Sequence, residues 1–200
     1  MRTPLKGAFR SAMVPLADGL ARLGVTANMV TVFGLIVSCG SAVLFAQGYA
    51  RWAAVVLLAS GLCDAIDGTL ARRTGTIGPY GAFLDSTVDR YADGAVLGGI
   101  AWHAAFGRGD KVGCALALVA LIGSFAVSYT RARAESVGQD CAVGFMERPE
   151  RVLTLAVGAL CGPQILPWAV AVLAGGTQIT AVQRILHVRR GLAARDGART

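Results

Sequence analysis

Four aspartates form two closely spaced pairs at neighbouring ends of two long apolar stretches. Asp64 and Asp67 lie near the end of one stretch, and Asp85 and Asp89 lie near the start of the next. Because each helical residue turns about 100°, the members of a pair lie about 60° or about 40° apart on one helix face. Charge is costly in hydrocarbon, so four carboxylates at these spacings favour a functional site over helix caps or interfacial salt bridges.

Converging carboxylates repel one another unless protons or cations lie between them. Hard divalent cations prefer oxygen ligands, and Mg²⁺ commonly combines a few carboxylates with phosphate oxygens and water. Two such cations about 4 Å apart would suit the four aspartates and would serve phosphoryl transfer. The short turn "RTGTIGP" makes the two apolar stretches antiparallel neighbours, so that the four carboxylates can converge.

The aspartates lie in or beside long apolar stretches, whose composition is typical of membrane helices. Hydrophobic residues make up 54% of the 200-residue chain and charged residues only 16%, whereas a soluble domain carries about 25% charge. Recurrent apolar stretches therefore predict an all-α, polytopic membrane protein with six transmembrane helices. The predicted spans are residues 28–46, 51–72, 80–106, 111–129, 151–166 and 167–186.

Residues 1–24 predict an amphipathic helix that lies on the membrane surface, because apolar residues recur there at helical spacing. The apolar stripe comprises Leu5, Phe9, Met13, Leu16 and Leu20. An ordinary bundle helix is the alternative interpretation. Residues 25–190 would then form a six-helix catalytic domain, and residues 191–200 a basic cytoplasmic tail.

The distribution of basic residues predicts the orientation. Most of the 19 Lys and Arg residues would lie on the side that carries both termini and the aspartates, and only Arg51, Arg108 and Lys111 on the other. The positive-inside rule places the first side in the cytoplasm, which predicts a multi-pass protein of the bacterial plasma membrane. Topology thus explains the net charge of +7, and no nucleic-acid partner is expected.

A spaced motif joins the aspartates to glycines and an arginine. It runs Asp64-x2-Asp67-Gly68-x2-Ala71-Arg72-x8-Gly81-x3-Asp85-x3-Asp89 and resembles the signature of the CDP-alcohol phosphotransferase family, with every fixed position present. The resemblance implies a Mg²⁺- or Mn²⁺-dependent enzyme with two ions per active site, commonly a homodimer. Such an enzyme transfers the lipid-bearing phosphoryl group of a CDP-linked lipid to an alcohol and releases CMP.

The resemblance also assigns roles to the matching positions. Asp64, Asp67 and Asp85 would bind metal, while Asp89 would contact the second metal and act as general base on the acceptor hydroxyl. The CDP-lipid would be bound by Asn28, Met29, Val30, Thr31, Gly68, Arg72 and Gly78. Some relatives carry a hydroxyl residue at the position of Gly78, so its backbone or nearby Thr76 would make that contact here.

Beyond the third span, the cytoplasmic side is rich in arginine, which binds phosphate with several directed donors. The segments "SYTRARAE" and "ERPER" resemble the phosphatidylinositol phosphate synthase branch of the family. The resemblance implies CDP-diacylglycerol as donor and inositol 1-phosphate as acceptor. Its acceptor-phosphate residues would be Ser128, Arg131, Arg133, Arg151 and Arg184.

Asp93 lies outside the motif and is interpreted as a supporting or structural residue, and Arg148 is left unassigned.

Two alternatives stay open. A phosphatidylglycerophosphate synthase of the same family would use glycerol 3-phosphate, which also carries a phosphate. A cation transporter would explain aspartates inside a membrane, because such residues often mark ion paths. The clustering of the carboxylates near one membrane face argues against a transport path.

Overall fold

The computed structural model describes the backbone of residues 4–197 and the side chains of residues 13–195. This part of the chain is all-helical, which confirms the predicted fold class. Residues 1–3 of the predicted surface helix and residues 198–200 of the predicted tail lie outside it. The helices are α1 (Pro4–Arg22), α2 (Ala27–Ala46), α3 (Ala50–Thr74), α4 (Pro79–Trp102), the π-helical turn η1 (His103–Gly107), α5 (Lys111–Ser136), α6 (Arg148–Leu160) and α7 (Leu166–Gly197).

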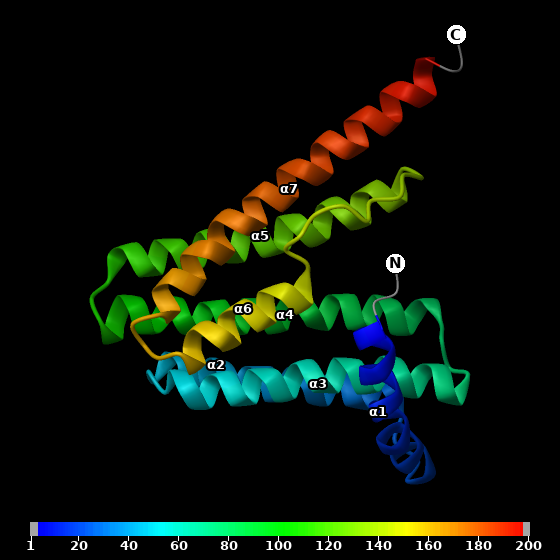
Figure 1. Cartoon of the computed structure of the whole chain (residues 1–200), viewed down its shortest axis with the longest axis horizontal. Helices are drawn as coiled ribbons and strands as arrows, with labels where there is room; N and C mark the ends of the chain where they lie inside the picture. Colours follow the sequence, from blue (N-terminus) through cyan, green and yellow to red (C-terminus); the bar gives the residue numbers. More distant parts are fainter. Residues whose placement is uncertain (1–3, 198–200) are drawn as a thin grey trace.

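The helix α2 packs against both α3 and α4, and α6 packs against α3. The helices α5 and α7 form a slanted pair, and α1 crosses the bundle at α3 (Figure 1). The main core receives buried side chains from α2 to α7, and many of them are alanines. Small residues let membrane helices approach closely. At Gly99 of α4, for example, a Cβ atom would overlap the backbone carbonyl of Ala42 in α2.

Four of the described helices, α2, α3, α5 and α7, are long and apolar enough to cross a membrane. This finding supports a membrane protein with several spans. The helix α4 is 24 residues long but carries charged residues of the motif, and α6 has only 13 residues. The predicted fifth span, 151–166, therefore differs from α6, because the "CGPQILP" segment interrupts the helix. The following helix α7 continues through residues 191–197 of the predicted tail.

The turn between α3 and α4 brings the two aspartate pairs to the same end of the bundle. Gly75 ends α3 with a φ of 68°, in the left-handed region that glycine adopts without strain, and Pro79 begins α4. The two helices are antiparallel, as expected (Figure 1). They are not packed neighbours, however, because α2 packs against both and they make almost no close backbone contact with each other. The aspartates thus approach one another from two helices that both pack against α2.

Candidate functional site

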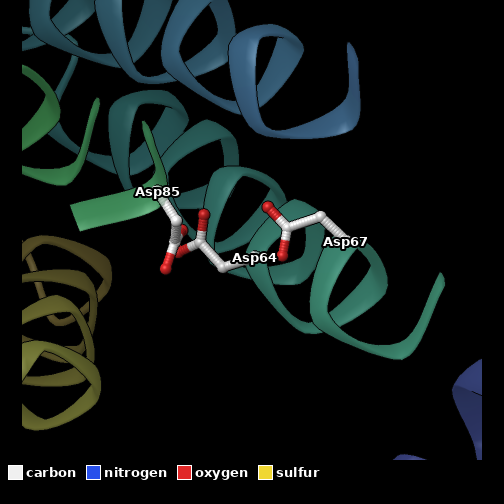
Figure 2. A group of neighbouring side chains, drawn as sticks. All are labelled: Asp64, Asp67 and Asp85. Carbon is white, nitrogen blue, oxygen red and sulfur yellow. The ribbon is translucent and has the colours of Figure 1, made fainter. Parts of the chain in front are cut away.

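Three of the four predicted metal ligands converge. Asp64 and Asp67 project from α3 and Asp85 from α4, and Figure 2 shows their carboxylates directed toward one another. One oxygen from each carboxylate lies within 4.8 Å of the others. Asp67 is buried, and Asp64 and Asp85 are half-buried. Three converging carboxylate oxygens, partly withdrawn from water, are a donor set that fits a hard divalent cation such as Mg²⁺ or Mn²⁺.

The start of α2 supports this carboxylate trio from one side. The hydroxyl of Thr31 donates a buried hydrogen bond of 2.7 Å to Oδ2 of Asp67. Asn28 is exposed one turn earlier, and its Oδ1 would lie 3.7 Å from a Cβ atom placed on Gly81. The intervening Met29 is exposed and Val30 packs into the small core beneath α1. Asn28 and Thr31 are therefore the members of the predicted segment that lie beside the motif.

Two glycines predicted to bind the donor, Gly68 and Gly78, are not required by protein packing. A Cβ atom on Gly68 would meet only the guanidinium of Arg72, at an ordinary contact distance of 3.5 Å. Arg72 also donates a hydrogen bond of 3.2 Å to Thr69 Oγ1. Gly78 has extended backbone at the start of α4, and a Cβ atom there would meet nothing within 4 Å. The space at Gly68 and Gly78 is thus open to a ligand.

The fourth predicted ligand, Asp89, lies beside the trio and is paired with arginines. Nη1 of Arg148 lies 2.7 Å from Oδ1 of Asp89 and also contacts Asp64, while Arg90 lies 3.4 Å from the other oxygen of Asp89. The Arg148 guanidinium, left unassigned by the sequence, therefore joins Asp64 to Asp89.

An open groove of about 1100 Å³ lies next to these residues, between α4, α5 and the start of α6. Both metal-motif aspartates of α4 line it, together with most of the predicted acceptor residues. The charged and polar side chains in its wall include Asp85, Asp89, Ser128, Arg131, Glu147, Arg148, Arg151 and Arg184. Arg133 is exposed outside the groove, where it donates to Ser136 Oγ at 3.2 Å.

The arginines of the groove differ in their burial and in their hydrogen-bond and ion-pair partners. Arg131 is exposed and pairs with Glu135 at 3.0 Å. Arg184 is only 2% exposed and donates to two backbone carbonyls and to Glu147, so it ties α7 to α5 and to the loop before α6. Arg151 is 3% exposed and pairs with Asp93 at 2.6 Å. Sequence reasoning gave no site role to Asp93 or Glu147, because each contacts an arginine far away in the chain.

Comparison with known proteins assigns the chain to a family. A sequence profile of the family "CDP-alcohol phosphatidyltransferase" matches residues 24–183. The chain is 38% identical to an archaetidylinositol phosphate synthase from Methanothermobacter thermautotrophicus, over 94% of each protein. It is also 38% identical to a phosphatidylinositol phosphate synthase from Streptomyces avermitilis, over 95% of this chain and 83% of that protein.

The fold matches solved structures of a related enzyme. The crystal structure of Mycobacterium tuberculosis phosphatidylinositol phosphate synthase with CDP-DAG bound superposes with a TM-score of 0.83 at 38% identity, covering 88% of this chain and 92% of that one. The same enzyme in complex with manganese and citrate superposes with a TM-score of 0.84 at 38% identity, covering 88% of each chain. This chain belongs to the CDP-alcohol phosphatidyltransferase family.

Proposed function

We propose that this chain transfers the phosphatidyl group of CDP-diacylglycerol to a hydroxyl of inositol 1-phosphate. The acceptor oxygen bonds to the lipid-bearing phosphorus as the bond from that phosphorus to CMP breaks, which yields phosphatidylinositol phosphate and CMP. One observation carries the proposal: a single groove joins Asp85 and Asp89 of the motif to the cationic wall formed by Arg131, Arg148 and Arg151. A reacting centre thus lies beside a site suited to a phosphate.

The donor end of the site is the carboxylate trio with its neighbours. A divalent cation would be held by Asp64, Asp67 and Asp85. Asp89 would complete the ligands of a second ion. Cations bound there would neutralise the diphosphate and stabilise charge on the transferred group. The CDP moiety would approach the backbone at Gly68 and Gly78 and contact Arg72, with Asn28 and Thr31 on the opposite side. The backbone of Met29 and Val30 completes this predicted segment.

Asp89 is the proposed general base. It lies in the groove wall, where an acceptor hydroxyl would arrive, and its side chain is 13% exposed. Contacts with Arg148 and Arg90 fix the direction of its carboxylate. A carboxylate is a weak base, but proton removal that accompanies attack on phosphorus needs only a positioned acceptor.

The acceptor end would bind the phosphate of inositol 1-phosphate through Ser128, Arg131 and Arg151. Arg184 would support this surface from behind, because its donors hold backbone carbonyls. Glycerol 3-phosphate, the acceptor of phosphatidylglycerophosphate synthases, would satisfy the same arginines. The relatives favour inositol phosphate, since two of them at 38% identity are named for products that contain it. Family membership argues against a cation transporter.

In the membrane, we propose six spans with both termini and the active site in the cytoplasm of a bacterial cell. The helix α4 is 24 residues long, enough for the hydrocarbon core. The 13-residue α6 would need the following residues, 161–165, to complete its crossing. The helix α1 would lie on the surface, held to α3 by a 2.8 Å ion pair between Asp18 and Arg73. A homodimer is the proposed assembly, as the family resemblance implies.

Comparison of acceptors tests the proposed function. Purified protein would receive CDP-diacylglycerol and Mg²⁺ with inositol 1-phosphate, glycerol 3-phosphate or free inositol, each offered separately, and CMP release would be measured. We expect turnover with inositol 1-phosphate and little with free inositol, because the latter has no phosphate for the arginines. Turnover with glycerol 3-phosphate alone would overturn the acceptor assignment and support the alternative.

A further inference from the structure

Asp93 lies on α4 one turn beyond Asp89 and outside the spaced motif. Its side chain is 9% exposed, and Oδ2 lies 2.6 Å from Nη2 of Arg151, whose side chain is 4% exposed. Its other oxygen lies 3.9 Å from Nε of Arg148. One largely buried carboxylate therefore contacts both arginines of the first turn of α6.

The ion pair with Asp93 determines the position of the Arg151 guanidinium. A buried guanidinium is costly unless a carboxylate and further acceptors replace its water. Arg151 has the Asp93 carboxylate and a longer hydrogen bond, 3.3 Å, to the carbonyl of Met146. Without the carboxylate, the guanidinium would keep a single weak acceptor among the contacts of the described residues. Asp93 thus fixes both the charge balance and the direction of Arg151.

The effect of Asp93 is directed to one end of the site. Arg151 lines the groove that contains Asp89, and its pair with Asp93 is 2.6 Å long. The contact of Asp93 with Arg148, the partner of Asp64, is longer at 3.9 Å, and Asp67 and Asp85 form no ion pair with Asp93 or Arg151 in the described part of the chain. Loss of the Asp93 charge would therefore disturb the acceptor side and leave the carboxylate trio in place. A pair that only fastened α6 to α4 would instead affect both substrates together when it was broken.

We propose that Asp93 is a positioning residue for the acceptor. It touches neither substrate, and it holds the Arg151 guanidinium in the orientation that binds the phosphate of the incoming alcohol. This inference rests on the proposed function, which makes the groove the acceptor site. It gives a role to an aspartate that the motif does not include.

Substitution of Asp93 tests the proposal. Asp93→Asn keeps the size of the side chain and removes its charge, so the KM for inositol 1-phosphate should rise about tenfold. The KM for CDP-diacylglycerol and the kcat at saturating acceptor should change less than about twofold. Asp93→Glu restores the charge and should give an acceptor KM between those of the wild type and Asp93→Asn. The matched control is Asp18→Asn, which breaks an exposed aspartate–arginine pair at α1 and should leave both KM values unchanged.

Other outcomes would contradict the positioning role of Asp93. An equal rise in both KM values, or a fall in kcat with both KM values unchanged, would overturn the proposal. If thermal unfolding shows that Asp93→Asn does not fold, the Asp93→Glu variant tests the proposal instead. Its longer side chain would displace Arg151, so an acceptor KM equal to that of the wild type would contradict the positioning role. The proposed function fails separately, if the wild-type protein uses only glycerol 3-phosphate. The same KM comparison would then be made with that acceptor.

Discussion

Nη1 of Arg148 lies 2.7 Å from Oδ1 of Asp89, and the same nitrogen contacts Asp64. A guanidinium from α6 therefore links a carboxylate of the trio on α3 to the proposed base on α4. The Arg148 side chain is only 16% exposed, so water contributes little to stabilising the two negative charges. Arg148 and a divalent cation would thus stabilise the same carboxylates.

This relationship predicts a stability effect that depends on metal. Arg148→Gln should lower the free energy of unfolding by about 3 kcal/mol in the presence of a chelator, because Asp64 and Asp89 lose a buried cationic partner. Added Mg²⁺ should recover much of the loss by replacing that charge. Denaturant unfolding in detergent, with and without Mg²⁺, measures both effects. Arg73→Gln, which breaks the exposed pair with Asp18, should cost less than about 1 kcal/mol.

The general base is tested by Asp89→Asn. The substitution keeps the shape of the side chain but removes its ability to take a proton, so kcat should fall about 10²- to 10⁴-fold. The affinity for CDP-diacylglycerol should stay close to the wild-type value, because the carboxylate trio and Gly68 are untouched. CMP release under single-turnover conditions, together with a separate donor-binding assay, measures the two quantities. Turnover at the wild-type rate would remove Asp89 from this role.

The metal ligands are tested by direct binding of Mn²⁺, followed by electron paramagnetic resonance. The wild-type protein should bind two ions per chain, and Asp67→Asn and Asp85→Asn should weaken binding about tenfold or more, since each removes a charged ligand. The control Asp110→Asn changes a carboxylate that caps α5, where Oδ1 accepts a 2.8 Å hydrogen bond from the Gly113 amide. Binding as in the wild type for both trio variants would contradict the assignment.

The two kinds of glycine in the bundle predict opposite results. Gly68→Ala should leave the melting temperature unchanged, because its Cβ atom would meet only Arg72 at 3.5 Å. It should raise the KM for CDP-diacylglycerol, since the methyl group fills space proposed for the nucleotide. Gly99→Ala should lower the melting temperature, because its Cβ atom would overlap Ala42. Thermal unfolding and donor kinetics test both variants, and an unaltered donor KM in Gly68→Ala would argue against nucleotide approach there.

Helical spacing predicted that Asp64 and Asp67 share one face of α3, because residues three or four apart do so whatever the rest of the fold does. The short turn before α4 predicted that Asp85 lies at the same end of the bundle. Asp64, Asp67 and Asp85 converge as expected. The rule could not show that α3 and α4 stand apart, since that depends on how α2 packs against both helices. It also could not foresee the shortness of α6, where apolar residues continue across a helix break.

The arginine contacts were beyond sequence reasoning for a related reason. Arg148 and Asp64 are 84 residues apart, and Arg151 and Asp93 are 58 residues apart. No local spacing relates such residues, so only the packing of α6 against its neighbours identifies the partners. Composition did predict that arginines gather on one side, but it did not distinguish Arg151, in the groove, from Arg133, outside it.

The identity of the lipid product decides whether this chain makes phosphatidylinositol phosphate. Wild-type protein would be incubated with CDP-diacylglycerol, inositol 1-phosphate and Mg²⁺, and CMP and lipid would be quantified together by mass spectrometry. We expect phosphatidylinositol phosphate and CMP in equal amounts, and neither when Mg²⁺ is removed by a chelator. Release of CMP without any inositol-containing lipid would contradict this expectation.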